Sequence, residues 1–316
     1  MFKIRTPNIY DIAILEKSFK DNQLIQSILK NKIALLTQTL IPHSLRFLPS
    51  IHLAIEEKDI LGYVILNSLS KVNNCWEIKE VFVFDELRNK GIGEELLKYV
   101  LSLYGGFGIE HFLCEVDSQN SAALSLFHGC GFRRYAKVYF YEKEFVVNEL
   151  NCSLLNKDFA LKTISKNDLK EIEKLELSTI PADLRFALSK SKEYFKEKNN
   201  SFVVIDKARD LIIGWSNIER LSNDNYFIEL LISPGWDYLY ENFLNTIICD
   251  LIAPKTNKLK LTVKVTDYLT ELTGILSKGG FLPVEIKELL VKTVWQKVKE
   301  RKTKSSKIGA PYIAPT

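Results

Sequence analysis

Residues 80–97 read EVFVFDELRNKGIGEELL, and this stretch decides the fold. Positions 81–84 form an apolar run, which is followed at once by a polar turn with glycine at positions 91 and 93. The apolar residues after the turn recur at helical spacing, so the stretch predicts a strand, a glycine-bearing turn and a helix in succession. Such a turn directs several backbone N–H groups at one point, where the positive end of the helix dipole also lies. The stretch therefore predicts a pyrophosphate-binding site.

The turn has the composition expected of a phosphate-binding loop. Gly91 and Gly93 would let the backbone approach a phosphate without an intervening side chain, and Arg88 and Lys90 would add positive charge. The spacing excludes two other phosphate loops. The dinucleotide fingerprint needs G-x-G-x-x-G, and a Walker A loop needs a Lys-Ser/Thr pair after its glycine.

Length and composition favour a globular protein of two domains. The chain has 316 residues, of which 46% are hydrophobic and 26% are charged, so packed cores are feasible. The formal net charge of +4 would suit an anionic cofactor, but the scattered basic residues predict no nucleic-acid partner. Residues 1–20 lack a signal-peptide pattern, and no apolar run is long enough to span a membrane. We therefore expect a soluble cytoplasmic protein without a membrane partner.

The cysteines and histidines predict neither a disulfide framework nor a metal site. The five cysteines are odd in number and include no C-x-x-C pair, which is typical of a reducing compartment. The four histidines, at positions 43, 52, 111 and 128, are not spaced as metal ligands. We therefore expect no bound metal.

A second motif follows the first along the chain. Hydrophobic periodicity over residues 2–142 predicts the order β-α-α-β-β-β-α-β-α-β, and residues 115–132 read EVDSQNSAALSLFHGCGF. Together the motifs resemble the GNAT superfamily of N-acetyltransferases, in which a strand and a turn lead to [RQ]-x-x-G-x-[GA] at the start of a helix. The second motif is most similar to the ribosomal-protein alanine acetyltransferase branch, which carries E-V-x-x-x-N-x-x-A-x-x-L-Y-x-x-x-G-F. The resemblance implies a mixed α/β fold with a mostly antiparallel central sheet and flanking helices.

Residues 158–297 repeat the plan of the first half. Four landmarks recur in order: residues 39–47 at 178–186, 61–63 at 213–215, 80–83 at 229–232, and 131–132 at 280–281. The last two pairs share one offset of 149 residues, which indicates a tandem duplication. We predict two acetyltransferase-like domains, at 1–148 and 156–298, that pair within the chain and precede a flexible tail at 299–316.

The second copy lacks the features that would bind a pyrophosphate. Its loop reads SPGWDYLY at residues 233–240, with no basic side chain and no G-x-G. Trp236 and Tyr238 are bulky where bare backbone would be needed, and Asp237 and Glu241 would repel phosphates. We expect the first copy to be catalytic and the second to be structural or to shape the substrate site. The alternative for the second copy is an aromatic-lined pocket for another ligand.

The resemblance implies that acetyl-CoA is the co-substrate. In the family, the central strand leaves its neighbour, and its free backbone pairs with the pantetheine arm while one N–H polarises the acetyl carbonyl. The residues that match this binding site are Val81, Phe82 and Val83 for the arm, Arg88, Asn89, Lys90, Gly91, Ile92 and Gly93 for the pyrophosphate, and Asn120 for a further bond to the arm. The acceptor is an unidentified amine, which could be a protein N-terminus, a lysine or a small molecule.

Three glutamates are candidates for the general base that deprotonates the amine. Glu115 matches the glutamate that serves as base in the alanine acetyltransferase branch, and Glu77 matches the base position of the histone acetyltransferase branch. Glu80 lies on the same strand as Glu77, and alternation predicts that the two side chains have opposite parity. Desolvation in an apolar strand makes a carboxylate a better base. We rank them Glu115, Glu80 and Glu77, and deprotonation through water without a single base stays open.

One position beside the cofactor departs from the family pattern. The family has a tyrosine where this chain has Phe127, and that tyrosine protonates the departing thiolate. Tyr139 could substitute as the acid, as could Tyr135 or Tyr141, or solvent could supply the proton. The missing hydroxyl also keeps open a second reading, in which the protein is a non-enzymatic acetyl-CoA sensor or scaffold.

Overall fold

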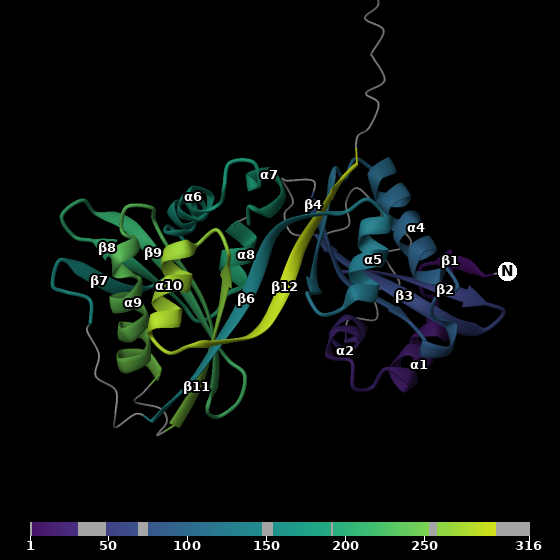
Figure 1. Ribbon diagram of the computed structural model, residues 1–316, viewed down its shortest axis with the longest axis horizontal. Coiled ribbons are helices and arrows are strands. Elements are labelled where there is room, and N and C mark those ends of the chain that lie inside the picture. Colours follow the sequence, from purple (N-terminus) through teal and green to yellow (C-terminus); the bar gives the residue numbers. More distant parts are fainter. Residues whose placement is uncertain are drawn as a thin grey trace, which may run out of the picture.

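The computed structural model describes residues 2–30, 49–68, 75–146, 154–190, 192–252 and 258–294. The chain is a mixed α/β protein in which helices flank one large, mostly antiparallel sheet, which confirms the predicted fold class (Figure 1). Two predicted features, the landmark at 39–47 and the tail at 299–316, lie outside the described residues.

The elements of the first half follow the predicted order. Its strands are β1 (Lys3–Arg5), β2 (Ser50–Glu56), β3 (Asp59–Ser68), β4 (Cys75–Val83), β5 (His111–Asp117) and β6 (Arg133–Val146). Its helices are α1 (Ile9–Ser18), α2 (Gln23–Leu29), α4 (Ile92–Gly106) and α5 (Ser121–Gly129), and a 3-10 turn (Asp85–Leu87) leads toward α4. The part of the chain between α2 and β2 at residues 31–48 lies outside the described residues.

The second half has the same order of strands as the first, with three helices between its first two strands. Its strands are β7 (Phe159–Thr163), β8 (Ser201–Asp206), β9 (Leu211–Arg220), β10 (Asn225–Ile232), β11 (Lys258–Thr266) and β12 (Leu282–Thr293). Its helices are α6 (Leu169–Thr179), α7 (Arg185–Leu188), α8 (Lys192–Glu197), α9 (Tyr240–Thr246) and α10 (Thr270–Lys278). A π-helical segment, Ile247–Ile252, follows α9.

The last strand of each half is inserted into the sheet of the other half. The strand order is β1-β2-β3-β4-β5-β12-β6-β11-β10-β9-β8-β7, so β12 lies against β5 and β6 lies against β11. β12 pairs with β5 over Lys287–Thr293, and β6 pairs with β11 over Val138–Val146. The two exchanged strands also pair with each other and run side by side through the centre of the molecule (Figure 1). The halves therefore share one continuous sheet.

Separate hydrophobic cores cover the two faces of the sheet in the first half. The apolar face of α4 is buried against one face of the sheet, with α5 beside it, because Leu96, Leu97 and Val100 recur at helical spacing. Helices α1 and α2 pack on the other face, where Phe19 and Tyr63 are members of a second core. The burial of both faces accounts for the long apolar runs in these strands.

Two candidate bases, Glu77 and Glu80, were predicted to point to opposite faces of the sheet, but β4 contains a β-bulge between them. Glu80 pairs with Ile65 and Glu77 pairs with Asn67, although the two glutamates are three residues apart and their partners only two. The extra residue in β4 shifts the alternation by one. The side chains of Glu77 and Glu80 therefore lie on the same face of the sheet, contrary to the simple count along the strand.

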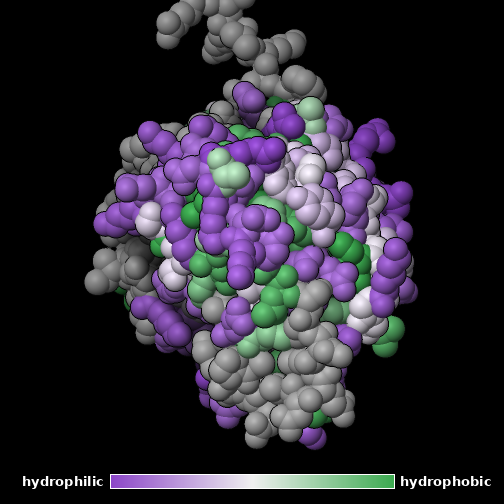
Figure 2. Space-filling model, turned by 90° about the vertical axis from the view of Figure 1, so that its left-hand side faces the viewer, coloured by the Kyte–Doolittle hydropathy of each residue, from purple (hydrophilic) through white to green (hydrophobic). Residues whose placement is uncertain are grey.

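The structure also corrects the expectation about disulfides. Cys249 is disulfide-bonded, whereas Cys75, Cys114 and Cys130 are free. Within the described ranges, no helix combines the length and hydropathy needed to cross a membrane, and no cluster of three potential metal ligands occurs. The outer face of the second half is largely hydrophilic, with smaller hydrophobic areas between the charged side chains (Figure 2).

Candidate functional site

A gap opens in the first half where β4 leaves β5. The parallel pairing of these strands ends at Glu77 and Leu113, so the rest of β4 has no neighbour on that side among the described strands. On the other side, the N–H of Phe84 donates to the carbonyl of Leu61, which fixes the alternation along the strand. The peptide groups of Val81 and Val83 therefore face the gap.

Phe82 differs from its two neighbours. It lies opposite Tyr63 on β3, and the two rings stack with centroids 5.1 Å apart. The same alternation directs its peptide groups to β3, so its backbone is not free for a ligand. Of the three residues predicted to hold the pantetheine arm, only Val81 and Val83 direct their backbone N–H groups to the gap.

The turn after β4 brings an uncapped helix start to the mouth of this gap. Gly91 is the N-cap of α4 with φ 79°, and it has no side chain that could accept the N–H groups of the first helical turn. The helices α1, α2 and α5 are instead capped by the side chains of Asn8, Asn22 and Asn120. The first turn of α4 is thus left open for an external acceptor.

The two glycines of the turn are needed for different reasons. A Cβ at Gly91 would meet no atom within 4 Å, so the left-handed φ and not the space requires glycine there. A Cβ at Gly93 would lie 3.2 Å from Leu126 Cδ2, so this glycine allows α4 to approach α5 closely. The sequence-based reason given for Gly93, bare backbone toward phosphate, is therefore incomplete.

The charged residues of the turn are exposed. Arg88 Nη2 lies 2.6 Å from Asp85 Oδ1, and Arg88 Nε donates to the carbonyl of Val83 at 3.3 Å. The guanidinium therefore lies beside the open edge of β4. Asn89 has φ 61° and Lys90 is exposed beside it, while Ile92 is buried as the first residue of α4.

The residues predicted around the leaving thiolate are not brought together. Asn120 caps α5, accepting the N–H of Ala123 at 3.0 Å. Phe127 is buried in the core beneath α4, edge-to-face with Phe132. Tyr139 instead packs in the core of the second half beside Tyr141, on the face covered by α9 and α10. The structure does not place the Tyr139 hydroxyl beside Phe127.

The corresponding edge in the second half is closed by its own side chain. The N–H of Ile232, which lies 149 residues after Val83, donates to the Tyr240 hydroxyl oxygen at 3.3 Å. Tyr240 is buried and lies 149 residues after Gly91. Among the described residues, no side chain accepts the equivalent N–H of Val83. The two halves thus differ at the donor that would meet a cofactor.

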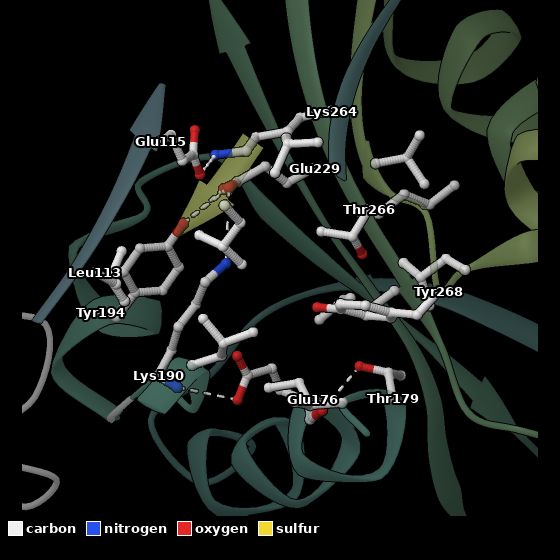
Figure 3. A pocket seen from close by; sticks show the side chains of 18 of the residues that line it. Leu113, Glu115, Glu176, Thr179, Lys190, Tyr194, Glu229, Lys264, Thr266 and Tyr268 are labelled. Carbon is white, nitrogen blue, oxygen red and sulfur yellow. Dashed lines mark hydrogen bonds and ion pairs between the residues drawn. The ribbon is translucent and has the colours of Figure 1, made fainter. Parts of the chain in front are cut away.

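Two of the candidate bases line a cavity that both halves build. The cavity has a volume of about 220 Å³, and we call it the shared cavity (Figure 3). Its polar lining consists of Glu77, Lys79 and Glu115 from the first half and Glu176, Thr179, Lys190, Tyr194, Glu229, Lys264, Thr266 and Tyr268 from the second. Leu113, Val138 and Leu289 form part of its apolar wall.

The glutamates of the first half have different partners. Glu115 Oε1 lies 2.5 Å from Lys264 Nζ, and Glu77 Oε2 lies 2.5 Å from Lys79 Nζ. Glu80 is outside the cavity lining and accepts hydrogen bonds from the Tyr63 hydroxyl at 2.9 Å and from Asn22. Burial and the nearby Glu80 carboxylate raise the pKa of Tyr63. Glu77 and Glu115 are therefore brought together, and Glu80 is held elsewhere.

Sequence analysis did not identify two further carboxylates of the cavity. Glu229 accepts from the Tyr194 hydroxyl at 2.9 Å and lies 2.9 Å from Lys198 Nζ. Burial opposes its ionisation, but Lys190 and Lys198 outweigh this and lower its pKa to about 2. Burial raises the pKa of Glu176 to about 7, although Lys190 opposes the shift. Glu229 was noted only as a landmark of the repeat, and Glu176 carries no motif signal in its helix.

Comparison with known protein families gives one match, which lies in the first half of the chain. Residues 11–132 match the family described as the acetyltransferase (GNAT) family. No curated protein sequence matches the chain.

Solved structures with a similar fold span nearly the whole chain. A GCN5-related N-acetyltransferase from Sphaerobacter thermophilus has a TM-score of 0.61 at 12% identity, over 94% of this chain and 97% of that one. A tandem GNAT protein from the clavulanic acid biosynthesis pathway has a TM-score of 0.60 at 10% identity, over 94% of this chain and 100% of that one. At such low identities the likeness shows the fold.

Proposed function

We propose that this chain is a tandem acetyltransferase of the GNAT type and that its first half, which contains the match to the GNAT family, transfers acetyl from acetyl-CoA to a primary amine. The proposal rests on one observation: the free backbone N–H groups at the start of α4 and those along the unpaired part of β4 border the same gap. The uncapped first turn of α4 would bind the pyrophosphate, and the free edge of β4 would bind the pantetheine arm. Arg88 and Lys90 would add charge at the turn, and residues 1–148 would carry the catalytic groups.

The proposed reaction is direct attack of the amine on the thioester. An N–H of Val81 or Val83 would polarise the acetyl carbonyl, since both face the gap. Glu115 is the first candidate for the base, as in the alanine acetyltransferase branch, and Glu77 is the second because it lines the same cavity. Glu80 ranks last, because Tyr63 and Asn22 already occupy its carboxylate.

We expect reversing the charge of Lys90 to weaken cofactor binding. Lys90→Glu should raise the Kd for acetyl-CoA about tenfold, since a charge-assisted phosphate contact contributes roughly 1.5 kcal/mol or more. Lys58→Glu makes the same charge change at an exposed hairpin turn of the same half and should leave the Kd within about twofold. Calorimetric titration of both variants makes the comparison, and equal affinities would contradict the assigned turn.

We expect the chain to bind one acetyl-CoA. In the second half, the Tyr240 hydroxyl already accepts the Ile232 N–H. The second turn also has Asp237 at the position that corresponds to Arg88 of the first turn. A titration that saturates at two molecules per chain with similar affinity would show that the second half is not degenerate.

The competing reading is a sensor that binds acetyl-CoA without transferring the acetyl group. It is favoured by the burial of Phe127 among apolar side chains and by the remote position of Tyr139. Solvent can protonate a thiolate, because thiols have a pKa of about 8.5, so the enzyme reading does not require a tyrosine. Measuring acetyl-CoA consumption against a panel of primary amines separates the two readings, since only an enzyme turns over.

A further inference from the structure

The shared cavity adjoins the place where the thioester would lie. Glu77 and Leu113 form the last pair between β4 and β5, so they mark the start of the gap, and both also line the cavity. Helices α6 and α8 of the second half contribute the opposite wall through Glu176 and Tyr194. A ligand in this cavity would therefore contact both halves and reach the reacting end of a cofactor in the gap.

Most charged side chains of the cavity form ion pairs. Lys264 pairs with Glu115 and Lys79 pairs with Glu77. Glu229 lies 3.8 Å from Lys190 Nζ in addition to its contact with Lys198. In the part of the chain that the structure describes, Glu176 is the one cavity carboxylate without an ion pair.

Glu176 is buried and only partly satisfied. Its exposed fraction is 3%, and one carboxylate oxygen accepts the backbone N–H of Lys190 at 3.0 Å. The other oxygen has no hydrogen-bond partner among the described residues, and Figure 3 shows the carboxylate directed into the cavity near Tyr268. A buried carboxyl group with a free oxygen is stabilised either by taking up a proton or by a ligand that supplies a cation or a donor, and the second route requires the ionised form.

We infer that the shared cavity binds the acceptor and that this acceptor is a compact diamine, with one amino group near Glu115 and a second cationic group paired with Glu176. Figure 3 shows these two carboxylates at opposite ends of the cavity, and the wall formed by Leu113, Val138 and Leu289 suits an alkyl chain. The volume of about 220 Å³ is below the roughly 300–1,000 Å³ of sites for drug-sized ligands, which favours a small molecule over a protein segment. The role of the diamine as acetyl acceptor rests on the proposed function, whereas its binding in the shared cavity does not.

The binding should depend on pH through Glu176. The groups whose charges act on this carboxylate are Lys190, Glu173 and Tyr268, and Glu229 with Tyr194 lies beyond Lys190. Burial raises the pKa of Glu176 to about 7, so the free protein holds it largely protonated below that pH. The ammonium requires the ionised form, so diamine affinity should rise with pH up to about 7 and fall by up to about tenfold per unit below it.

The test is calorimetric titration of the full chain with putrescine, butylamine and aminobutanol. These three ligands have the same carbon chain and differ only in the terminal group. We expect putrescine to bind about 10- to 100-fold more tightly than the other two, as one charge-assisted contact would give. Glu176→Gln keeps the acceptor for the Lys190 N–H and should reduce the affinity for putrescine to that for butylamine. Glu171→Gln, on the same helix but outside the cavity, should bind like wild type.

The outcomes separate this inference from the proposed function. Equal affinities for putrescine and butylamine, or a preference that survives in Glu176→Gln, overturn the inference. A preference that is lost in Glu176→Gln, together with no acetyl transfer to any amine, supports the diamine site and overturns the enzyme reading. Circular dichroism of Glu176→Gln and a partial loss of affinity in Glu176→Asp exclude misfolding as the cause.

Discussion

Glu115→Gln should lower kcat for acetyl transfer by about 10²–10⁴-fold, while the Kd for acetyl-CoA stays within about twofold. The carboxylate lies on β5 beside the gap and faces the shared cavity, where an acceptor amine would lose its proton. Glutamine keeps the size of the side chain and a carbonyl oxygen for Lys264, but it cannot take the proton. The expected loss is therefore in chemistry and not in binding.

A matched control for this prediction lies elsewhere in the same sheet. Glu142 also projects from a strand and pairs with a lysine, Lys260, at 2.6 Å, but it does not line the cavity. Glu142→Gln should leave kcat within about twofold. If Glu115→Gln retains its rate and Glu77→Gln loses it, the base is Glu77. Full activity in both variants would indicate deprotonation through water.

Removing a single side chain of β12 should destabilise the first half of the protein. Leu290 is fully buried in the core beneath α4, although it belongs to the last strand of the second half. Leu290→Ala should cost about 2–5 kcal/mol of unfolding free energy, as for other large-to-small changes in a core. Leu282→Ala, at an exposed position of the same strand, should change it by less than about 0.5 kcal/mol.

Hydrogen exchange shows where this destabilisation occurs. Amides of β5 pair with β12 over Lys287–Thr293, so Leu290→Ala should speed their exchange more than that of β8. The same pairing predicts that residues 1–148 do not fold stably alone, whereas a fusion of 1–148 to 282–294 through a flexible linker does. Stable, cooperative folding of residues 1–148 without β12 would contradict the importance of the exchange.

Local sequence was sufficient for the features that depend on neighbouring residues. The stretch at 80–97 forms the predicted strand, turn and helix, because its apolar spacing and Gly91 act over one or two turns of chain. The degenerate turn of the second copy was also visible, since it lacks basic residues and the G-x-G spacing. The sequence did not show that the Tyr240 hydroxyl occupies the free edge of β10.

Tertiary structure alone decided the features that depend on distant residues. The bulge that places Glu77 and Glu80 on one face of the sheet could not be predicted from the alternation of side chains along β4. It is visible only when β4 is aligned with β3, where one residue of β4 has no partner. The partner of Glu115 is Lys264, 149 residues away, and Glu176 has no local signal at all. The exchange of β6 and β12 is invisible for a related reason. The partner of each strand is selected by the free energy of long-range pairing and burial, which no single segment of sequence contains.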